Sequence, residues 1–390
     1  MNLPSLQNLK IAILGLGYVG LPLAIEFEKR KFCNLTQQKL SRKVVGFDIN
    51  PNRINELINN FDRTNEISEE QLKSCKNIKY TSDPQFLNNC DLFIITVPTP
   101  IDDSKIPNLK PLINASQIVG RAIYERNNIG AIKSKPVIVY ESTVFPGATE
   151  EICIKEIEKV SSLSSEKNEF FFGYSPERIN PGDKKNSLTN IKKLTSGNIE
   201  ISSKWINDIY ASIINAGTYK CKSIKVAEAA KVIENTQRDI NIALVNEFSL
   251  IFSRLNIDTL DVLEAAGTKW NFLNFTPGLV GGHCIGVDPY YLTYKAQTVG
   301  YHPEVLLSGR RINDSMGIKF IEKLILKMAQ NGQKIKDSKL LILGITFKEN
   351  CPDIRNTGVI SIVSKAKEYG FLIDIVDPYV SQLEAKQAYN

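Results

Sequence analysis

The chain has 390 residues, 43% of them hydrophobic and 23% charged, with a formal net charge of +6. This length is too great for one hydrophobic core and predicts two or three domains of ordinary globular composition. The modest charge, carried by scattered basic residues, argues against a nucleic-acid-binding protein and favours anionic small molecules as ligands. No apolar run is long enough to span a membrane and the N-terminus lacks a secretory pattern, so we expect a cytoplasmic protein without membrane association.

The seven cysteines and two histidines restrict the possible metal and disulfide chemistry. The cysteines are odd in number, widely spaced and contain no C-x-x-C pair. This pattern argues against a disulfide scaffold or a zinc ribbon and suits a reducing compartment. Two histidines are too few for a histidine-rich metal site, so we expect no metal.

Strand-like and helix-like segments alternate in the N-terminal half. Residues 10–14 form a short apolar run that leads directly into GLGYVG, and a helix-like segment follows. Such alternation predicts an α/β fold in which helices cover a parallel sheet. Further strands are predicted at 43–48, 91–100, 136–143 and 170–177.

The pattern changes after about residue 200. Residues 223–255 contain neither Gly nor Pro, and apolar residues recur three and four positions apart, which predicts a helix about 50 Å long. Because this helix is apolar on more than one face, we expect it to join two domains or to form the interface of a homodimer or higher oligomer. Residues 338–348 and 371–378 then repeat the strand-to-glycine and strand-to-aspartate patterns of the N-terminus. We therefore predict a Rossmann-like NAD-binding domain at 1–205, a central helical domain at 206–330 and a partial Rossmann-like domain at 331–390.

The G-x-G-x-x-G segment predicts a dinucleotide site. Gly15, Gly17 and Gly20 allow the backbone to approach a pyrophosphate at a helix N-terminus. Asp48 ends the next strand and can bond a ribose hydroxyl, which favours NAD over NADP. A tight turn with a surface aspartate is the alternative, and NAD binding is the better interpretation because the motif follows a strand and opens a helix.

Cys284 lies in the most glycine-rich turn of the chain, directly after Gly281, Gly282 and His283, and four residues before Asp288. Glycines before a thiol remove side-chain bulk, so a substrate can reach the sulfur. In an NAD enzyme this suggests covalent chemistry on an aldehyde. The alternative, a small buried hydrophobe in a turn, is about equally consistent with these residues alone.

Four other residues are candidates only in combination. Lys231 and Asn235 lie four positions apart and share one face of the long helix, although Lys231 alone reads as a solvated lysine. Thr143 and Glu177 each end a predicted strand, where catalytic residues gather in such sheets. Taken singly, each of the last two is better explained as a cap or a surface residue.

Several motifs together resemble the UDP-sugar 6-dehydrogenase family, which includes the UDP-glucose dehydrogenases. His283 before Cys284 and VDPYYL after it are similar to the UDP-N-acetylhexosamine branch, in particular the N-acetylglucosamine and N-acetylgalactosamine enzymes of bacterial polysaccharide synthesis. The resemblance implies an NAD-dependent, four-electron oxidation of C6 of a UDP-N-acetylhexosamine to a carboxylate. The motifs are GLGYVGLP, TVPTP, ESTVFPG, GYSPERINPG, AEAAKVIENTQRDIN, AAGTKWNF, PGLVGGHCIGVDPYYL and GITFKENCPDIRN.

The resemblance also implies roles for individual residues. Cys284 would form a thiohemiacetal and then a thioester with C6, while Lys231 and Asn235 would stabilise the developing oxyanion. Asp288 and Thr143 would position water or relay a proton, and Glu177 would be the general base of thioester hydrolysis. The implied NAD contacts are Gly15, Gly17, Tyr18, Val19, Gly20, Asp48, Arg53, Thr99, Thr143 and Arg355. The implied substrate contacts are Glu177, Arg178, Lys231, Asn235, Phe272, Asn274, Gly278 and Lys348.

The sequence departs from the family pattern in two places. Pro181 occupies the position of a second glutamate found in the UDP-glucose branch, so any role of that glutamate does not carry over. Family members also continue beyond residue 390, so we expect the C-terminal, UDP-binding domain to be truncated. Two alternatives remain: a hydroxyacid or 6-phosphogluconate type of dehydrogenase that needs no cysteine, and a non-catalytic relative that binds NAD or UDP-sugar. The sequence does not select among the N-acetylhexosamine epimers.

Overall fold

The computed structural model describes residues 2–102, 104–128, 130, 134–179, 187–282, 285–349 and 351–389. The chain divides into two compact units, Met1–Val232 and Ile233–Asn390. Among the described helices, none combines the length and the apolar character that a bilayer crossing requires.

A sheet of eight strands, in the order β3-β2-β1-β4-β5-β6-β7-β8, organises the first unit. Its strands pair in parallel except that β7 runs antiparallel to β6. The strands are β1 (Lys10–Leu14), β2 (Lys43–Phe47), β3 (Ile78–Thr81), β4 (Leu92–Ile95), β5 (Val137–Tyr140), β6 (Phe171–Tyr174), β7 (Lys193–Gly197) and β8 (Thr218–Lys220).

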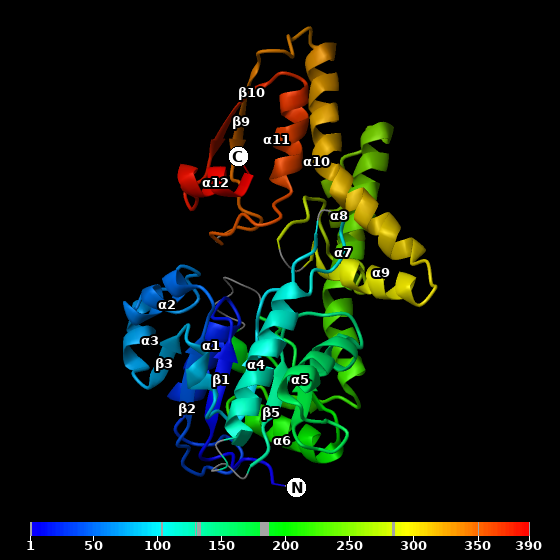
Figure 1. The fold of residues 1–390 in the computed structure, drawn as a ribbon. Helices are drawn as coiled ribbons and strands as arrows, with labels where there is room; N and C mark the ends of the chain where they lie inside the picture. The colour runs from blue at the N-terminus through cyan, green and yellow to red at the C-terminus, as the bar shows by residue number, and fades with distance from the viewer. Residues whose placement is uncertain are drawn as a thin grey trace. The chain divides into compact units, whose positions relative to one another are not determined.

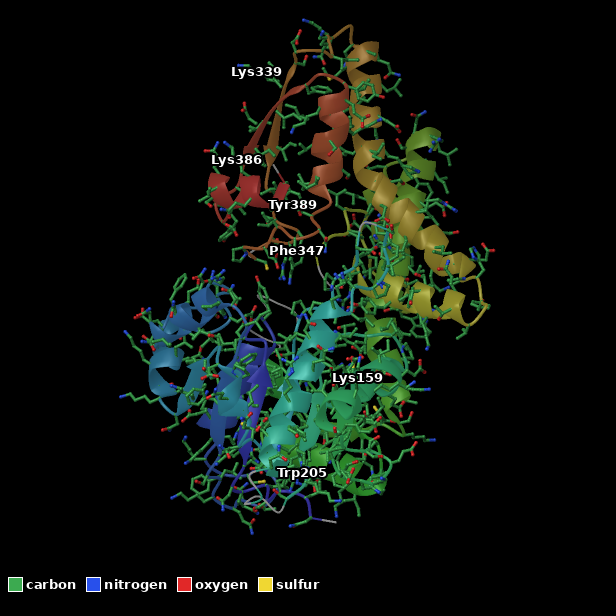
Figure 2. The ribbon with its side chains drawn as sticks, viewed as in Figure 1. Lys159, Trp205, Lys339, Phe347, Lys386 and Tyr389 are labelled. Atoms are coloured by element: carbon green, nitrogen blue, oxygen red, sulfur yellow. The ribbon has the colours of Figure 1, made fainter. Side chains whose placement is uncertain are left out.

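Helices cover this sheet and close its core. Helices α4 and α5 lie side by side (Figure 1). On α6, buried Trp205, labelled in Figure 2, donates its indole N–H to the Pro4 carbonyl at 2.9 Å and so holds the N-terminal segment. The helices are α1 (Gly20–Lys29), α2 (Pro51–Ile58), α3 (Glu69–Ser74), α4 (Lys110–Asn128), α5 (Ile154–Ser161) and α6 (Glu200–Ala211), with short turns of helix η1 (Pro84–Leu87), η2 (Thr149–Cys153) and η3 (Leu188–Asn190).

The predicted α/β class and the predicted strands of the first unit are confirmed: β1 has the predicted bounds, and β2, β4, β5 and β6 end earlier than predicted. Strands β3, β7 and β8 were not predicted. β7 is buried but polar, since Lys193, Thr195 and Ser196 are each at most 2% exposed, and a polar strand has no apolar run to detect. β8 has only three residues, none of them buried.

The second unit contains long helices and a small sheet. Helix α7 (Ile224–Leu255) has 32 residues, begins in the first unit and covers the predicted helix at 223–255 except for its first residue. Two parallel strands, β9 and β10, pack through Leu340 and Ile373 onto a small core around Ile321. The remaining elements are α8 (Thr259–Gly267), α9 (Asp288–Thr298), α10 (Glu304–Gln330), β9 (Lys339–Leu343), α11 (Val359–Glu368), β10 (Leu372–Val376) and α12 (Gln382–Tyr389).

Candidate active site

In the turn between β1 and α1, each of the three glycines is required for a different physical reason. Gly15 has φ +92°, a left-handed conformation that favours glycine. A Cβ on Gly20 would lie 1.9 Å from the Gly15 carbonyl oxygen and 2.4 Å from Thr96 Oγ1, so only glycine fits between helix and strand. A Cβ on Gly17 would meet nothing within 4 Å, which leaves the backbone open to a ligand. This division of roles is the one that a pyrophosphate-binding turn requires.

Asp48, directly after β2, reaches across to this turn. Its Oδ2 accepts the Leu16 N–H at 2.9 Å and its Oδ1 accepts the Asn50 N–H at 2.9 Å. Buried Arg53 donates Nε–H to the Leu16 carbonyl at 2.8 Å and pairs with Asp62 at 2.7 Å. Arg53 therefore supports the turn through the Leu16 carbonyl, and its predicted contact with NAD stays a prediction.

The loops after β4 and β5 are joined at the same carboxyl edge of the sheet. Thr99 donates its hydroxyl to the Thr143 carbonyl at 2.8 Å, and Ser142 donates its hydroxyl to the Val97 carbonyl at 2.7 Å. Thr99 and Thr143, both predicted from the sequence, are thus brought together. Tyr18 and Val19 lie partly buried in the glycine turn.

Glu177 lies in a buried ionic cluster after β6. The Lys193 ammonium contacts Glu177 Oε2 at 3.0 Å and Glu141 Oε2 at 2.7 Å, and Tyr210 donates its hydroxyl to Glu141. Burial would lower the pKa of Lys193, but the two carboxylates outweigh it and raise that pKa. Burial raises the pKa of Glu141, and the neighbouring Glu177 adds to the effect. Lys193 is therefore positively charged, and its ammonium pairs with two carboxylates, Glu141 after β5 and Glu177 after β6.

Lys231 lies on α7 with only 7% of its surface exposed, so it is not the solvated lysine that its sequence alone suggested. Among the described residues its ammonium has no hydrogen-bond or ion-pair partner. Its Nζ is not fully buried, so the ammonium is open to solvent or to a ligand. One turn earlier, Glu228 accepts the N–H groups of Gly147 and Thr149 at 2.5 and 3.0 Å and fixes the loop that follows Thr143.

In the second unit, Asn235 and Asp288 come together. Asn235 Nδ2 donates to Asp288 Oδ2 at 2.6 Å, and the two residues are 7% and 2% exposed. Asp288 is the first residue of α9, and Asn235 lies on α7. His283, Cys284 and Pro181 fall outside the described residues. The structure thus brings together two predicted residues, Asn235 and Asp288, whose contact with each other was not predicted.

The backbone that leads toward residue 283 is held at both ends within the second unit. Asn246 on α7 accepts the Gly278 N–H at 2.8 Å and donates to the Gly278 carbonyl at 3.0 Å. Gly282 has φ +82°, and a Cβ there would lie 2.7 Å from the ring of Phe347, which is labelled in Figure 2. The glycines before Cys284 thus have a packing reason in addition to the access for substrate that the sequence suggested.

The remaining predicted residues are distributed over loops. Phe272 is partly buried and Asn274 is exposed in the segment after α8. Lys348 follows β9, where its carbonyl accepts the Thr346 hydroxyl at 3.0 Å. The guanidinium of Arg355 folds onto Asp353, with Nε donating at 3.0 Å. In the first unit, Arg178 donates Nη1–H to the Lys192 carbonyl at 2.9 Å.

Comparison with known proteins decides the family. Residues 9–214, 225–315 and 341–390 match, in order, the NAD binding, central and UDP binding domains of the UDP-glucose/GDP-mannose dehydrogenase family. The chain belongs to this family. The resemblance read from the sequence is therefore confirmed, and NAD is the cofactor for which the first domain is built.

Two members of the family with high sequence identity to this chain are UDP-N-acetyl-D-glucosamine 6-dehydrogenases. The chain is 55% identical to the UDP-N-acetyl-D-glucosamine 6-dehydrogenase of Salmonella typhi, over 99% of this chain and 86% of that protein. It is 52% identical to the enzyme of the same name from Pseudomonas aeruginosa, over 98% and 86% of the two chains. Among solved structures, the UDP-D-ManNAc dehydrogenase of Pyrococcus horikoshii superposes with a TM-score of 0.83 at 29% identity, over 95% and 84% of the two chains.

Sequence reasoning missed three residues that organise this family member's site. Lys193 and Glu141 were not predicted because nothing in IKKLTSG or YEST shows that the two charges are buried together. Asn246 was not predicted because an asparagine on a long helix reads as solvated. Asn246 follows Asn235 by eleven residues, which make three helical turns, so the two asparagines lie on the same face of the helix. This spacing was the one signal for Asn246 in the sequence.

Proposed function

We propose that the chain is an NAD-dependent UDP-N-acetylhexosamine 6-dehydrogenase that converts C6 of the sugar from alcohol to carboxylate. The observation that carries the proposal is the buried Asn235–Asp288 pair, 2.6 Å apart, in which Asp288 comes four residues after Cys284 of the GGHC sequence. The identity of 52–55% to UDP-N-acetyl-D-glucosamine 6-dehydrogenases over nearly the whole chain supports the substrate class and makes UDP-N-acetylglucosamine the first candidate.

NAD fits the first unit. Gly17 provides the open backbone, Asp48 provides carboxylate oxygens that each accept one N–H, and α1 presents its N-terminus. NAD, when bound, supplies the hydride acceptor for each of two successive two-electron oxidations. Arg53 and the Thr99–Thr143 contact keep the surrounding loops in place.

The chain's own residues carry the covalent chemistry. The thiol of Cys284 adds to the C6 aldehyde, forming a C–S bond, and its proton passes to the new oxygen. The Lys231 ammonium stabilises negative charge on that oxygen, and the Asn235 side chain holds the same oxygen. After the second oxidation, water attacks the thioester carbon, the C–S bond breaks, and carboxylate and thiol are released. Glu177 accepts the proton of the water, and Asp288 and Thr143 orient the water.

Cys284 is the nucleophile that the family resemblance implies, and burial makes at least two of the other cysteines poor competitors. The six described cysteines are all buried, and none of them forms a disulfide. Burial raises the pKa of Cys75 to about 11 and that of Cys90 to about 12, which keeps both as unreactive thiols at neutral pH.

We also propose a homodimer formed through α7. Exposed apolar residues recur along one face of this helix at spacings of eleven, seven and four, so they form a single stripe. A stripe of this kind on an enzyme of this size indicates a protein–protein contact. The stripe consists of Ile233, Leu244, Ile251 and Leu255, which are 45–59% exposed. Light scattering after chromatography of Leu244→Glu tests it, and an unchanged mass would contradict it.

The test of the activity is the NADH yield per UDP-N-acetylglucosamine consumed, with Cys284→Ser in parallel. A yield of two per sugar, lost in the variant, supports the covalent four-electron reaction. NADH formation that survives Cys284→Ser favours a dehydrogenase that needs no cysteine. NAD binding without NADH formation from any UDP-N-acetylhexosamine favours a non-catalytic relative.

A further inference from the structure

Three strand ends meet in the Glu141–Lys193–Glu177 cluster of the first unit. Glu141 follows β5 and Glu177 lies three residues after β6. Because β7 runs antiparallel to β6, its first residue, Lys193, lies at the same carboxyl edge. The side chains of Lys193 and Glu141 are 2% and 0% exposed, and that of Glu177 is 9% exposed. The carboxyl edge of a doubly wound sheet is where ligands bind.

The Glu177 carboxylate has a fixed orientation. Its Oε1 accepts the N–H groups of Arg178 and Ile179 at 2.6 and 2.7 Å. Its Oε2 accepts from Lys193 Nζ at 3.0 Å. Among the described residues, Lys193 is the one cation within ion-pair distance of Glu177, and a carboxylate oxygen with one donor can still accept a second hydrogen bond.

Lys193 is itself held from two further sides. Glu141 Oε2 accepts from its ammonium at 2.7 Å, and Glu141 also accepts the Tyr210 hydroxyl from α6. The ammonium lies 5.3 Å from the centre of the Tyr210 ring. These contacts leave Lys193 no alternative rotamer that avoids breaking a buried ion pair, so its charge stays beside Glu177.

Lys193 is the counter-ion that Glu177 shares with Glu141. The groups that face Glu177 are Lys193 from β7, Glu141 from the end of β5, Tyr210 from α6 and the adjacent Arg178. Two carboxylates share one ammonium. Without that ammonium, two buried carboxylates would remain together, and one of them would take up a proton.

We propose that Lys193 is a positioning residue for thioester hydrolysis, which pairs with Glu177 Oε2 and so holds in place the carboxylate that takes the proton of the attacking water. The inference rests on the proposed function and deepens it. In the hydrolytic step, the water oxygen bonds to the thioester carbon and the C–S bond breaks. Glu177 takes one proton of the water, and the second passes to the leaving sulfur, which restores the Cys284 thiol and leaves a carboxylate. Lys193 exchanges no proton in this step and acts only through Glu177.

The test is the pH dependence of kcat in two variants that change the charge beside Glu177 in opposite ways. Lys193→Met removes the positive charge, so the acid limb of the kcat profile moves to higher pH, by about one to three units. Glu141→Gln removes the competing negative charge, so that Glu177 is the only carboxylate of the cluster that pairs with the Lys193 ammonium. The acid limb of the kcat profile then moves to lower pH. Lys193→Arg keeps the charge and restores a profile near that of the wild type.

Single-turnover kinetics isolate the step. If hydrolysis becomes limiting in Lys193→Met, stopped-flow absorbance records a burst of two NADH per active site before slow turnover. Arg126→Met is the matched control, because Arg126 is also a buried cation, paired with Asp91 at 2.9 Å, but lies outside the cluster. This control loses stability without a shift of the acid limb and without a burst.

Opposite shifts in Lys193→Met and Glu141→Gln support the inference, since loss of stability cannot produce both signs. Shifts in the same direction, or unshifted profiles in both variants, overturn it while the proposed function stands. If Lys193→Met does not fold, the profile of Glu141→Gln alone decides, and an unshifted acid limb overturns the inference. If the wild type forms no NADH from any UDP-N-acetylhexosamine, the proposed function fails and this inference with it.

Discussion

Replacing Gly17 or Gly20 with alanine separates cofactor binding from folding within one turn. At Gly20 the new methyl would lie 1.9 Å from the Gly15 carbonyl oxygen, which is backbone and cannot turn aside. We expect Gly20→Ala to lower the free energy of unfolding by about 3 kcal/mol. For a unit of this size that is a fall in Tm of about 6–12 °C.

At Gly17 the same methyl would meet no atom within 4 Å. We expect Gly17→Ala to change the free energy of unfolding by at most about 0.5 kcal/mol. The methyl would, however, occupy the space of the pyrophosphate, so the Kd for NAD rises at least about tenfold, which is about 1.4 kcal/mol.

Thermal unfolding with and without NAD measures both effects, because a ligand that binds the folded state raises Tm. The wild type gains stability from NAD, whereas Gly17→Ala melts at the wild-type temperature without NAD and gains little from it. Isothermal titration gives the Kd directly. A Gly17→Ala variant that binds NAD as tightly as the wild type would refute the placement of the pyrophosphate at this turn. A Gly20→Ala variant that melts with the wild type would refute the packing argument.

Three further predictions concern buried polar groups. Arg310→Met leaves the buried Asp239 carboxylate, now 2.6 Å from Arg310, without its cation, and we expect a loss of about 3–5 kcal/mol in urea unfolding. Burial raises the pKa of Glu228 from 4.5 to about 7, so the folded state holds this proton more tightly than the unfolded chain and stability falls as pH rises between these values. Glu228→Gln removes that fall, which is at most about 3 kcal/mol, when urea unfolding is compared at pH 5 and pH 8. Asn246→Ala removes both bonds to Gly278, and we expect the KM for the UDP-sugar to rise about tenfold with a smaller change in kcat, in steady-state assays.

The parts of the site that could be predicted from sequence are those whose chemistry is local. The glycine turn was predictable because strand, three glycines and helix follow within one short segment. Lys231 and Asn235 could be placed on one helix face by spacing alone. The contact of Asn235 with Asp288 could not, because it depends on how α9 packs on α7.

The parts of the candidate site that could not be predicted depend on the burial of charged side chains, which no local sequence pattern indicates. Lys193 follows another lysine in a segment that reads as surface, yet the antiparallel turn into β7 buries it between two glutamates. The apolar strands revealed the sheet, but the strand that brings the cation to the candidate site is polar. The domain division at 205 and 330 remains a prediction.

The aspartates at the ends of β2 and β10 show how one sequence signal can have two physical causes. Asp48 Oδ2 accepts the Leu16 N–H at 2.9 Å, and Asp377 Oδ2 accepts the Ile345 N–H at 2.7 Å, in each case directly after a glycine with φ near +90°. Oδ1 of each accepts the N–H two residues further on.

A carboxylate at the end of the second strand therefore stabilises the glycine turn whether or not a ribose binds. The distinction lies in what surrounds it. Oδ2 of Asp377 also accepts the Thr346 N–H at 3.3 Å, and these backbone bonds outweigh burial and lower its pKa. Each oxygen of Asp48 accepts one N–H and can still bond a hydroxyl. The strand-end aspartate thus supports NAD binding in the first unit only together with the open Gly17 backbone. In the second unit the same residue type is explained by the turn that it holds before Lys348.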